Sequence, residues 1–556
     1  MLPLLPKLKG NWEAEGTILG KRMMGIYVAL VLVFSGMLCR LYVLSSGELL
    51  ASAANTQSAF LLEVDRSRGV IYDRDLVPLV GTHRRTVAAV QPSPEANTAL
   101  AEAINEYGHP IEFDPEATRP YLLELGEARI YAPYIEMFEI QDRYSQEQLA
   151  PHVIGYLSPE QDHGAAGIEL SYDTILKQYE GSLSLRYTLD ASGQALRADT
   201  MPEVVRENYQ NPGGVVLTLD ADIQRAAQTA MEGVEKGAAV VMDVNTGDLA
   251  AVVSVPAYDA NQLAESLYDP NSPFVNRAFS QYNVGSTFKL VTAAAALENG
   301  YGKDTPYTCV GAVDVNGQIF HCHWRIGHGE IDLKKAIEIS CNPFFINLGL
   351  EVGGKPIVSL AREIGFSKAA VFSEDLSTQS GTLPSDNELR DPAAVANLSF
   401  GQGSLTATPV QIAQMISTVA NGGYAVTPRL VAGFTDDGET FLNHTPSYAP
   451  NRVISKRTSD ILRDCLVSNV EEGSGVKAKP LYGTAGGKTA SAQTGIYLDP
   501  EDEDSEIVHA WFAGYYPAQQ PQYAIVVLVE GGESGSDAAG PIFRRIADAI
   551  HLIQLK

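Results

Sequence analysis

Cysteine, positive charge and long apolar runs are all scarce in this sequence. Five cysteines in 556 residues are too few for a disulfide scaffold. The 40 lysines and arginines are outnumbered by 67 acidic residues, and the net charge of −27 repels phosphate, which argues against a nucleic-acid partner. An apolar fraction of 45% excludes a disordered chain, and the length predicts about two to four domains.

Metal ligands in a recognisable pattern are scarce as well. His321, Cys322 and His323 form a local cluster, but adjacent side chains point in different directions. No second cysteine or histidine pair follows at a zinc-binding spacing. The sequence therefore predicts no metal site and no cofactor.

Only one long apolar run occurs, from Met23 to Cys39, and it resumes after Arg40. We expect a transmembrane anchor over residues 23–44, with Arg40 reaching to the outer interface. Basic residues precede the run, which predicts a cytoplasmic tail over residues 1–22, a single pass through the cell membrane and an extracytoplasmic remainder. They are Lys7, Lys9, Lys21 and Arg22.

A cleaved signal peptide is the alternative, because Ala51-Ser52-Ala53 has the small residues of a cleavage site. The apolar run is long for a signal peptide, however, and this site lies far beyond its end. The uncleaved anchor is therefore preferred.

A turn-forming cluster, Asn211-Pro212-Gly213-Gly214, indicates a domain boundary near residue 212. Residues 45–211 are expected to form one domain and residues 212–556 another. Strands are predicted at both ends of the second domain, at 238–242, 249–255, 511–515 and 523–530, with helices between them. This order predicts an α+β fold with an antiparallel sheet covered by helices.

The first chemical motif is Ser286-Thr287-Phe288-Lys289, followed by the apolar stretch 290–297. A spacing of three residues places Ser286 and Lys289 on one face of a helix, one turn apart. Burial by the apolar stretch lowers the proton affinity of a lysine, so Lys289 can accept the proton of a serine nucleophile.

The second motif, Ser340-Cys341-Asn342, follows an amphipathic stretch. Ser340 can relay a proton between the lysine and a leaving amine, and the amide of Asn342 can bind a substrate carbonyl. Taken alone, both residues are ordinary helix caps.

The third motif, Lys488-Thr489-Ala490, lies in a strand of small and polar residues along which a peptide can bind. Lys488 supplies a positive charge and Thr489 a hydroxyl for a substrate carboxylate. The backbone N–H groups of Ser286 and Ser491 are expected to form an oxyanion hole.

Two further segments repeat these spacings. Ser474-Gly475-Val476-Lys477 follows acidic residues and precedes no apolar helix, so we expect a surface loop. Ser385-Asp386-Asn387 lies in a polar stretch after Pro384 and is interpreted in the same way.

The three motifs resemble the S-x-x-K, S-x-N and K-[TS]-G motifs of the penicillin-binding transpeptidases, which cross-link peptidoglycan. Other stretches also resemble that family: 68–74 (RGVIYDR), 167–169 (GIE), 276–278 (NRA), 401–403 (GQG) and 511–514 (WFAG). The resemblance covers about residues 60–550. The short anchor, and a segment 46–211 without a glycosyltransferase pattern, indicate the class B subgroup, which is monofunctional.

This resemblance implies an elongated, β-rich pedestal of the dimerisation type over residues 45–211 and a β-lactamase-like serine transpeptidase domain over residues 212–556. It implies that Lys488 and Thr489 bind the carboxylate of a D-Ala-D-Ala stem peptide, that Lys289 activates Ser286, and that Ser340 helps to protonate the departing D-alanine. β-Lactam antibiotics enter the same route and remain as an acyl-enzyme. A separate membrane glycosyltransferase is the expected partner.

Two features depart from the family or go beyond it. Ala490 replaces the usual glycine, and its methyl group is expected to narrow the acyl-binding slot. Cys341 lies inside the second motif, and a disulfide between Cys322 and Cys341 would move the Ser340 turn. The alternative for these cysteines is a pair of buried thiols.

Two other functions fit the motifs. A β-lactam hydrolase or sensor of the same fold has no use for the large segment 46–211, and only a hydrolase turns penicillin over. A non-catalytic scaffold of the cell-wall machinery needs none of the predicted catalytic residues, and all of them are present.

Overall fold

The computed structural model describes residues 12–45, 59–107, 112–126, 128–189, 195, 202–442, 444–445, 449–497, 499, 502 and 506–555. Residues 1–11 of the expected cytoplasmic tail lie outside the described residues. The chain divides into two compact units, which we call the first and second unit. The first consists of Met1–Arg66, Thr86–Ile140 and Ser182–Glu207, and the second of Ser67–Arg85, Gln141–Gly181 and Asn208–Lys556.

Each unit is built from separate segments, so the packing does not follow the single boundary predicted near residue 212. Strand β2 (Val70–Tyr72) pairs in parallel with β8 (Gly214–Leu217), which ties an early segment to the second unit. Within that unit, the buried Arg68 guanidinium donates to the carboxylate of Glu169 at 3.0 Å. A buried ion pair left without one partner is costly, so these segments are held where they pack.

Helix α1 (Trp12–Ser45) is continuous over 34 residues. Its stretch Gly20–Val43 is 24 residues long. Among the described helices taken singly, this is the only one that is long and apolar enough to cross a membrane. At about 1.5 Å per residue it exceeds the roughly 30 Å of a bilayer core. It contains the predicted span 23–44 except for its last residue.

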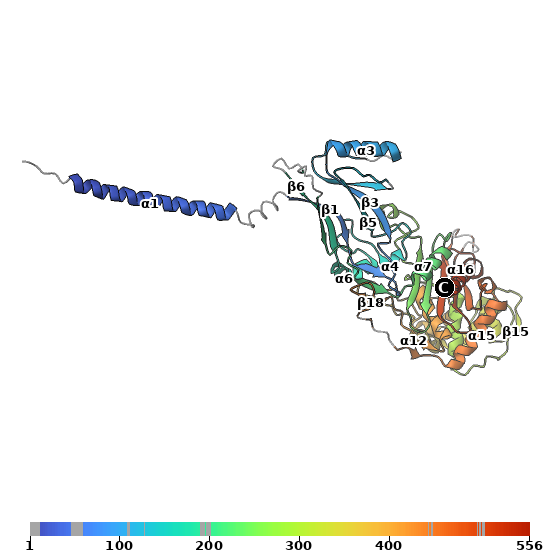
Figure 1. Cartoon of the computed structure of the whole chain (residues 1–556). Coiled ribbons are helices and arrows are strands. Elements are labelled where there is room, and N and C mark those ends of the chain that lie inside the picture. Colours follow the sequence, from blue (N-terminus) through green and yellow to red (C-terminus); the bar gives the residue numbers. More distant parts are fainter. Residues whose placement is uncertain are drawn as a thin grey trace, which may run out of the picture. The chain divides into compact units, whose positions relative to one another are not determined.

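The first unit is rich in strands (Figure 1). Strands β1 (Ala59–Ser67), β6 (Gly181–Thr188) and β7 (Glu203–Glu207) form one three-stranded sheet. Strands β4 (Tyr121–Gly126), β3 (His83–Val90) and β5 (Ile135–Asp142) form a second. Helix α3 (Pro94–Tyr107) contributes Leu100 to a core with Ala88 and Val90 of β3.

The second unit contains an antiparallel five-stranded sheet in the order β10-β9-β22-β21-β20. The strands are β9 (Gly237–Asp243), β10 (Leu249–Val255), β20 (Gly486–Tyr497), β21 (Glu506–Tyr516) and β22 (Tyr523–Val529). Because β9 and β10 come early in the segment Asn208–Lys556 and the others late, the two ends of this segment meet in one sheet. The chain between them supplies most of the helices.

Alternate residues of these strands enter two separate cores, as the period of two in a strand requires. Val240 and Met242 pack in the core that contains α14 (Pro409–Ala420), whereas Ala239 and Val241 pack in the core with α7 (Ala221–Ala230) and α16 (Gly540–Gln554). Helices therefore cover both faces of the sheet. The predicted α+β fold with an antiparallel sheet is confirmed.

Candidate active site

Ser286 lies in the short helix η1 (Gly285–Phe288), just before α9 (Lys289–Glu298). Gly285 has φ +55°, and its N–H donates to the carbonyl of Gly401 at 3.0 Å. A Cβ at Gly285 would lie 3.1 Å from the Cα of Ala492 in β20. Glycine at this turn therefore lets the serine approach the sheet edge closely.

Lys289 is fully buried at the start of α9. Its Nζ donates to the backbone oxygen of Ser340 at 2.8 Å, to Ser340 Oγ at 3.0 Å and to Asn342 Oδ1 at 2.7 Å. Burial lowers the pKa of Lys289 to about 7. In a large fraction of the molecules the amine of Lys289 is then neutral near pH 7, and this neutral amine can accept a proton.

Ser340 connects the other two side chains. Its hydroxyl donates to Ser286 Oγ at 3.1 Å while it accepts from Lys289. Among the described contacts, Ser286 and Lys289 share no direct hydrogen bond, so the hydroxyl of Ser340 is the path between them. Ser340 adopts φ +54°, an unfavourable backbone conformation for a residue with a side chain and one that is typical of functional sites.

Asn342 begins α11 (Asn342–Val352), which follows α10 (Leu333–Glu338) after a tight turn. The turn places the residues on both sides of Cys341 around the lysine amine. The three predicted residues Ser286, Lys289 and Ser340, together with Asn342, therefore meet at one point.

Lys488 and Thr489 lie on β20, the edge strand that η1 packs against. Lys488 is fully buried, and burial followed by repulsion from Lys289 lowers its pKa well below the ordinary value. Its Nζ donates to the backbone oxygen of Thr489 at 3.0 Å and to Thr489 Oγ1 at 3.4 Å. Ser491 is exposed on the same strand, and its hydroxyl accepts from the N–H of Gly535 at 3.3 Å.

The expectation of a surface loop at Ser474 is wrong. Ser474 is half-buried, and its Oγ lies 2.8 Å from Thr489 Oγ1 and donates to Asn469 Oδ1 at 3.0 Å. The amide of Asn469 donates in turn to the backbone oxygen of Gly487 at 2.7 Å. Val476 and Lys477 of this segment are exposed, and Lys477 pairs with Asp537.

Sequence spacing drew attention to Ser474 but assigned it the wrong environment, because the contact with Thr489 depends on how α15 (Lys456–Glu472) packs on β20. The other repeated spacing behaves as expected, since Ser385, Asp386 and Asn387 are all exposed.

Ala490 is nearly inaccessible and packs in an apolar core that also contains Trp511, its partner across the β20–β21 ladder. The expectation that its methyl group faces an open slot is therefore not met. A Cβ at Gly535 would lie 2.4 Å from the backbone oxygen of Ala490, so the segment after β22 also closes over this position.

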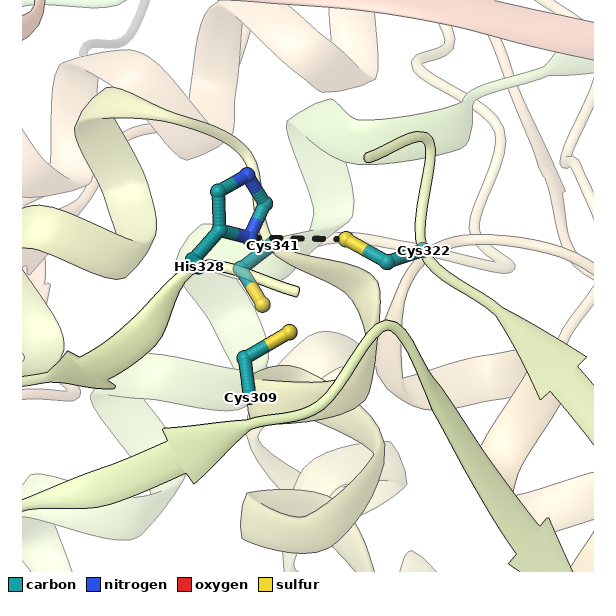
Figure 2. A group of neighbouring side chains, drawn as sticks. All are labelled: Cys309, Cys322, His328 and Cys341. Atoms are coloured by element: carbon teal, nitrogen blue, oxygen red, sulfur yellow. Dashed lines mark hydrogen bonds between the residues drawn. The ribbon is translucent and has the colours of Figure 1, made fainter. Parts of the chain in front are cut away.

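A second cluster lies behind the Ser340 turn (Figure 2). It consists of Cys309, Cys322, His328 and Cys341, and one ligand atom from each lies within 4.8 Å of all the others. Cys322 Sγ and His328 Nδ1 are 3.5 Å apart, and the three cysteines are buried. A hydrogen bond with Cys341 lowers the pKa of Cys322 and raises that of Cys341.

The cluster changes two sequence-based expectations. All five cysteines are free thiols, so the disulfide between Cys322 and Cys341 is not formed in this structure. The sequence predicts no metal site, whereas the structure gathers a candidate ligand set whose four residues come from separate strands and loops at irregular spacing. Three thiols and an imidazole could hold a soft divalent metal such as zinc.

The sheet, its covering helices and the three motifs define a transpeptidase domain. Comparison with known proteins shows the family to which this domain belongs. The profile described as the penicillin-binding protein transpeptidase domain matches residues 237–548. The chain belongs to the class B penicillin-binding proteins.

Three relatives illustrate this membership. The peptidoglycan D,D-transpeptidase PbpA of Mycobacterium tuberculosis (strain CDC 1551 / Oshkosh) is 30% identical over 407 residues, covering 66% of this chain and 81% of PbpA. The ceftriaxone acyl-enzyme of penicillin-binding protein A from M. tuberculosis superposes with a TM-score of 0.62 at 26% identity, covering 74% of this chain and 93% of that one. A chain from a structure of a peptidoglycan synthase complex that coordinates polymerisation and crosslinking gives 0.69 at 26% identity, covering 95% and 97%.

Proposed function

We propose that this protein is a peptidoglycan D,D-transpeptidase of the serine type, anchored to the cell membrane by α1 with its N-terminus in the cytoplasm. The observation that carries the proposal is the half-buried chain of hydrogen bonds from Lys289 Nζ through Ser340 Oγ to Ser286 Oγ, with steps of 3.0 and 3.1 Å. A neutral lysine at the end of this chain can draw the proton from the serine.

Substrate binding begins at β20. The terminal carboxylate of a D-Ala-D-Ala stem peptide binds Lys488 and Thr489 and restores the positive charge that burial disfavours on Lys488. The amide of Asn342 binds the peptide backbone. The backbone N–H groups of Ser286 and Ser491 then stabilise the developing oxyanion.

Catalysis proceeds through an acyl-serine. Ser286 attacks the penultimate carbonyl as its proton passes through Ser340 to Lys289, and the C–N bond to the terminal D-alanine breaks as Ser340 returns a proton to the leaving amine. The amine of a neighbouring stem peptide next attacks the acyl-enzyme and forms the cross-link. A β-lactam acylates Ser286 by the same route.

A membrane glycosyltransferase is the proposed partner. The relative in the peptidoglycan synthase complex belongs to an assembly that joins polymerisation with crosslinking. A monofunctional transpeptidase anchored in the same membrane needs such a source of new glycan strands.

Labelling with fluorescent penicillin tests the proposal. The full-length chain in detergent is expected to become labelled and to stay labelled for many minutes, whereas Ser286→Ala stays dark. Rapid loss of label with release of hydrolysed penicillin would favour the hydrolase. A dark wild-type protein whose Ser286→Ala variant complements fully would favour the scaffold.

A further inference from the structure

Strand β20 is the outer strand of the five-stranded sheet, so one of its edges has no neighbouring strand. In an extended strand the N–H and C=O of one residue point to the same side, and successive residues alternate between the two sides. The carbonyl of Gly486 points to β21, because a Cβ at Gly514 of that strand would lie 2.5 Å from its oxygen. The backbone groups of Gly487, and of every second residue after it, therefore face the open edge.

Most of the carbonyls on this edge are already occupied. The register of β20 with β21 is regular from Gly486 to Gln493, so four carbonyls face the edge, and side chains donate to three of them. Among the described contacts, only the carbonyl of Ser491 receives no side-chain donor. The three bonds run from Asn469 Nδ2 to Gly487 O at 2.7 Å, from Lys488 Nζ to Thr489 O at 3.0 Å and from Asn283 Nδ2 to Gln493 O at 2.6 Å.

Asn283 lies three residues before the nucleophile, at the end of the short strand β11 (Tyr282–Asn283). Its backbone oxygen accepts from Trp511 Nε1 at 3.0 Å, while its side-chain amide donates to Gln493. Both ends of the residue are therefore fixed to the sheet. The bond that ties the Ser286 turn to β20 also uses up the carbonyl of Gln493.

The regular edge of β20 ends at the same place. The register with β21 shifts between Gln493 and Tyr497, and Gly495 has φ +74°. The carboxylate of Glu506 accepts from the side-chain amide of Gln493 at 2.6 Å and from the N–H of Gly495 at 2.8 Å. An extended peptide thus finds a regular edge only as far as Gln493.

The proposed substrate pose fixes which peptide residue meets this end. A donor peptide with its carboxylate at Lys488 and its reacting carbonyl at Ser491 runs antiparallel to β20. The acylated residue then lies opposite Ser491, accepts from its N–H and donates to its free carbonyl. The next peptide residue that faces β20 in this way is two positions earlier, opposite Gln493. Its N–H meets a carbonyl that Asn283 already occupies.

We propose that Asn283 is a specificity-determining residue that ends the pairing between β20 and the donor peptide after the acylated residue. The enzyme then recognises the C-terminal end of the donor by its backbone and gains nothing from the N–H two positions before the acylated residue. The inference rests on the proposed function, because it takes the donor peptide to lie along β20 for acylation of Ser286.

Two acetylated tetrapeptides that end in D-Ala-D-Ala test this inference. One contains only amides, and the other has an ester oxygen in place of the N–H of its first residue, which lies two positions before the acylated residue. With the full-length chain in detergent, release of D-alanine gives kcat/KM for each peptide, and slowing of fluorescent-penicillin labelling gives its affinity. The amide-to-ester ratio within one variant cancels any loss that both peptides share.

The wild-type ratio is expected to be near one. Asn283→Ala removes the side chain, and Asn283→Asp keeps a similar shape without an N–H to donate. Both variants free the carbonyl of Gln493, so the ratio is expected to rise by about 2–12-fold, the effect of one hydrogen bond.

Two controls accompany these variants. Asn347→Ala is the matched substitution, since Asn347 is also half-buried but its amide donates to Glu351 within its own helix. Its ratio is expected to equal that of the wild type. A third peptide, with an ester oxygen in place of the N–H of the acylated residue, is expected to lose about 2–12-fold in every protein, because the carbonyl of Ser491 is free in all of them.

A wild-type ratio well above one, or a ratio that neither Asn283 variant changes, would overturn the inference. So would a wild-type protein that penicillin labels but whose labelling and D-alanine release are unaffected by the peptides, because no donor then lies along β20. If the Asn283 variants do not fold, the wild-type ratio and the third peptide decide. A wild-type protein that penicillin does not label contradicts the proposed function instead.

Discussion

The second unit buries two lysines completely, and their surroundings differ. Lys289 donates to three oxygens that belong to another segment of the chain, on Ser340 and Asn342. The hydrogen bonds described for Lys488 end on its own neighbour, Thr489. Burial lowers the pKa of both, to about 7 for Lys289 and well below the ordinary value for Lys488.

The difference indicates two roles for one residue type. Lys289 is fixed by the protein itself, so its amine serves an internal step, the uptake of a proton. Lys488 lacks an acidic partner among the described contacts, so the anion that matches it comes from outside. We infer that a substrate carboxylate completes the Lys488 site.

The largest expected effect comes from replacing Lys289. It separates the role of Lys289 as a base from the role of Lys488 in binding. Lys289→Met keeps a long apolar side chain in the buried space but removes the base. Acylation by penicillin is expected to fall by about 10²–10⁴-fold, mainly in the maximal acylation rate. Stopped-flow acylation at increasing penicillin concentrations separates this rate from binding, and a variant with a near-normal maximal rate would exclude Lys289 as the base.

Lys488→Met is expected to act on binding. Loss of a charge-assisted hydrogen bond costs about 1.5–3 kcal/mol, or roughly 10–150-fold in affinity for a β-lactam that carries a carboxylate. Lys477→Met is the matched control, because Lys477 lies nearby in the sequence but is exposed and paired with Asp537. Equal losses in both variants would contradict a specific carboxylate site at Lys488.

The pH dependence of acylation sharpens the same contrast. The neutral form of Lys289 is the base, and it predominates above its pKa of about 7. The acylation rate is therefore expected to rise with pH through about 7 and to level off above it. Rates measured from pH 5 to 9 in buffers of constant ionic strength test this, and a flat profile or a midpoint near the ordinary lysine pKa would contradict it.

The smallest expected effect concerns Ser474, which supports Thr489 without being part of the predicted site. Ser474→Ala removes a hydrogen bond worth about 0.5–1.5 kcal/mol, so binding of a carboxylate-bearing β-lactam is expected to weaken by about 2–12-fold. The maximal acylation rate is expected to stay unchanged. A loss confined to that rate would show that Ser474 acts elsewhere.

The sequence predicted most of what is local in this molecule. The spacing of Ser286 and Lys289, the apolar stretch that buries the lysine and the strands at both ends of the second unit all follow from neighbouring residues. The apolar run of α1 was recognisable for the same reason. Ser340 and Asn342 were found because their motif resembles a known family, not because spacing reveals that they meet Lys289.

What escaped prediction depends on long-range packing. The pairing of β2 with β8 joins positions far apart in the chain, so a single boundary near residue 212 could not describe the units. Ser474 meets Thr489 only after α15 packs on β20, and the ligands of the cysteine cluster are spread over separate loops. A sequence window of ordinary length contains neither the β2–β8 pairing nor the whole set of cluster residues.

Identification of the acylated residue tests the central claim most directly. The full-length wild-type protein is labelled with penicillin and digested, and the peptide that carries the adduct is sequenced by mass spectrometry. We predict that the adduct lies on Ser286. An adduct on Ser474, which has the same spacing to Lys477, or on any other residue would contradict the account.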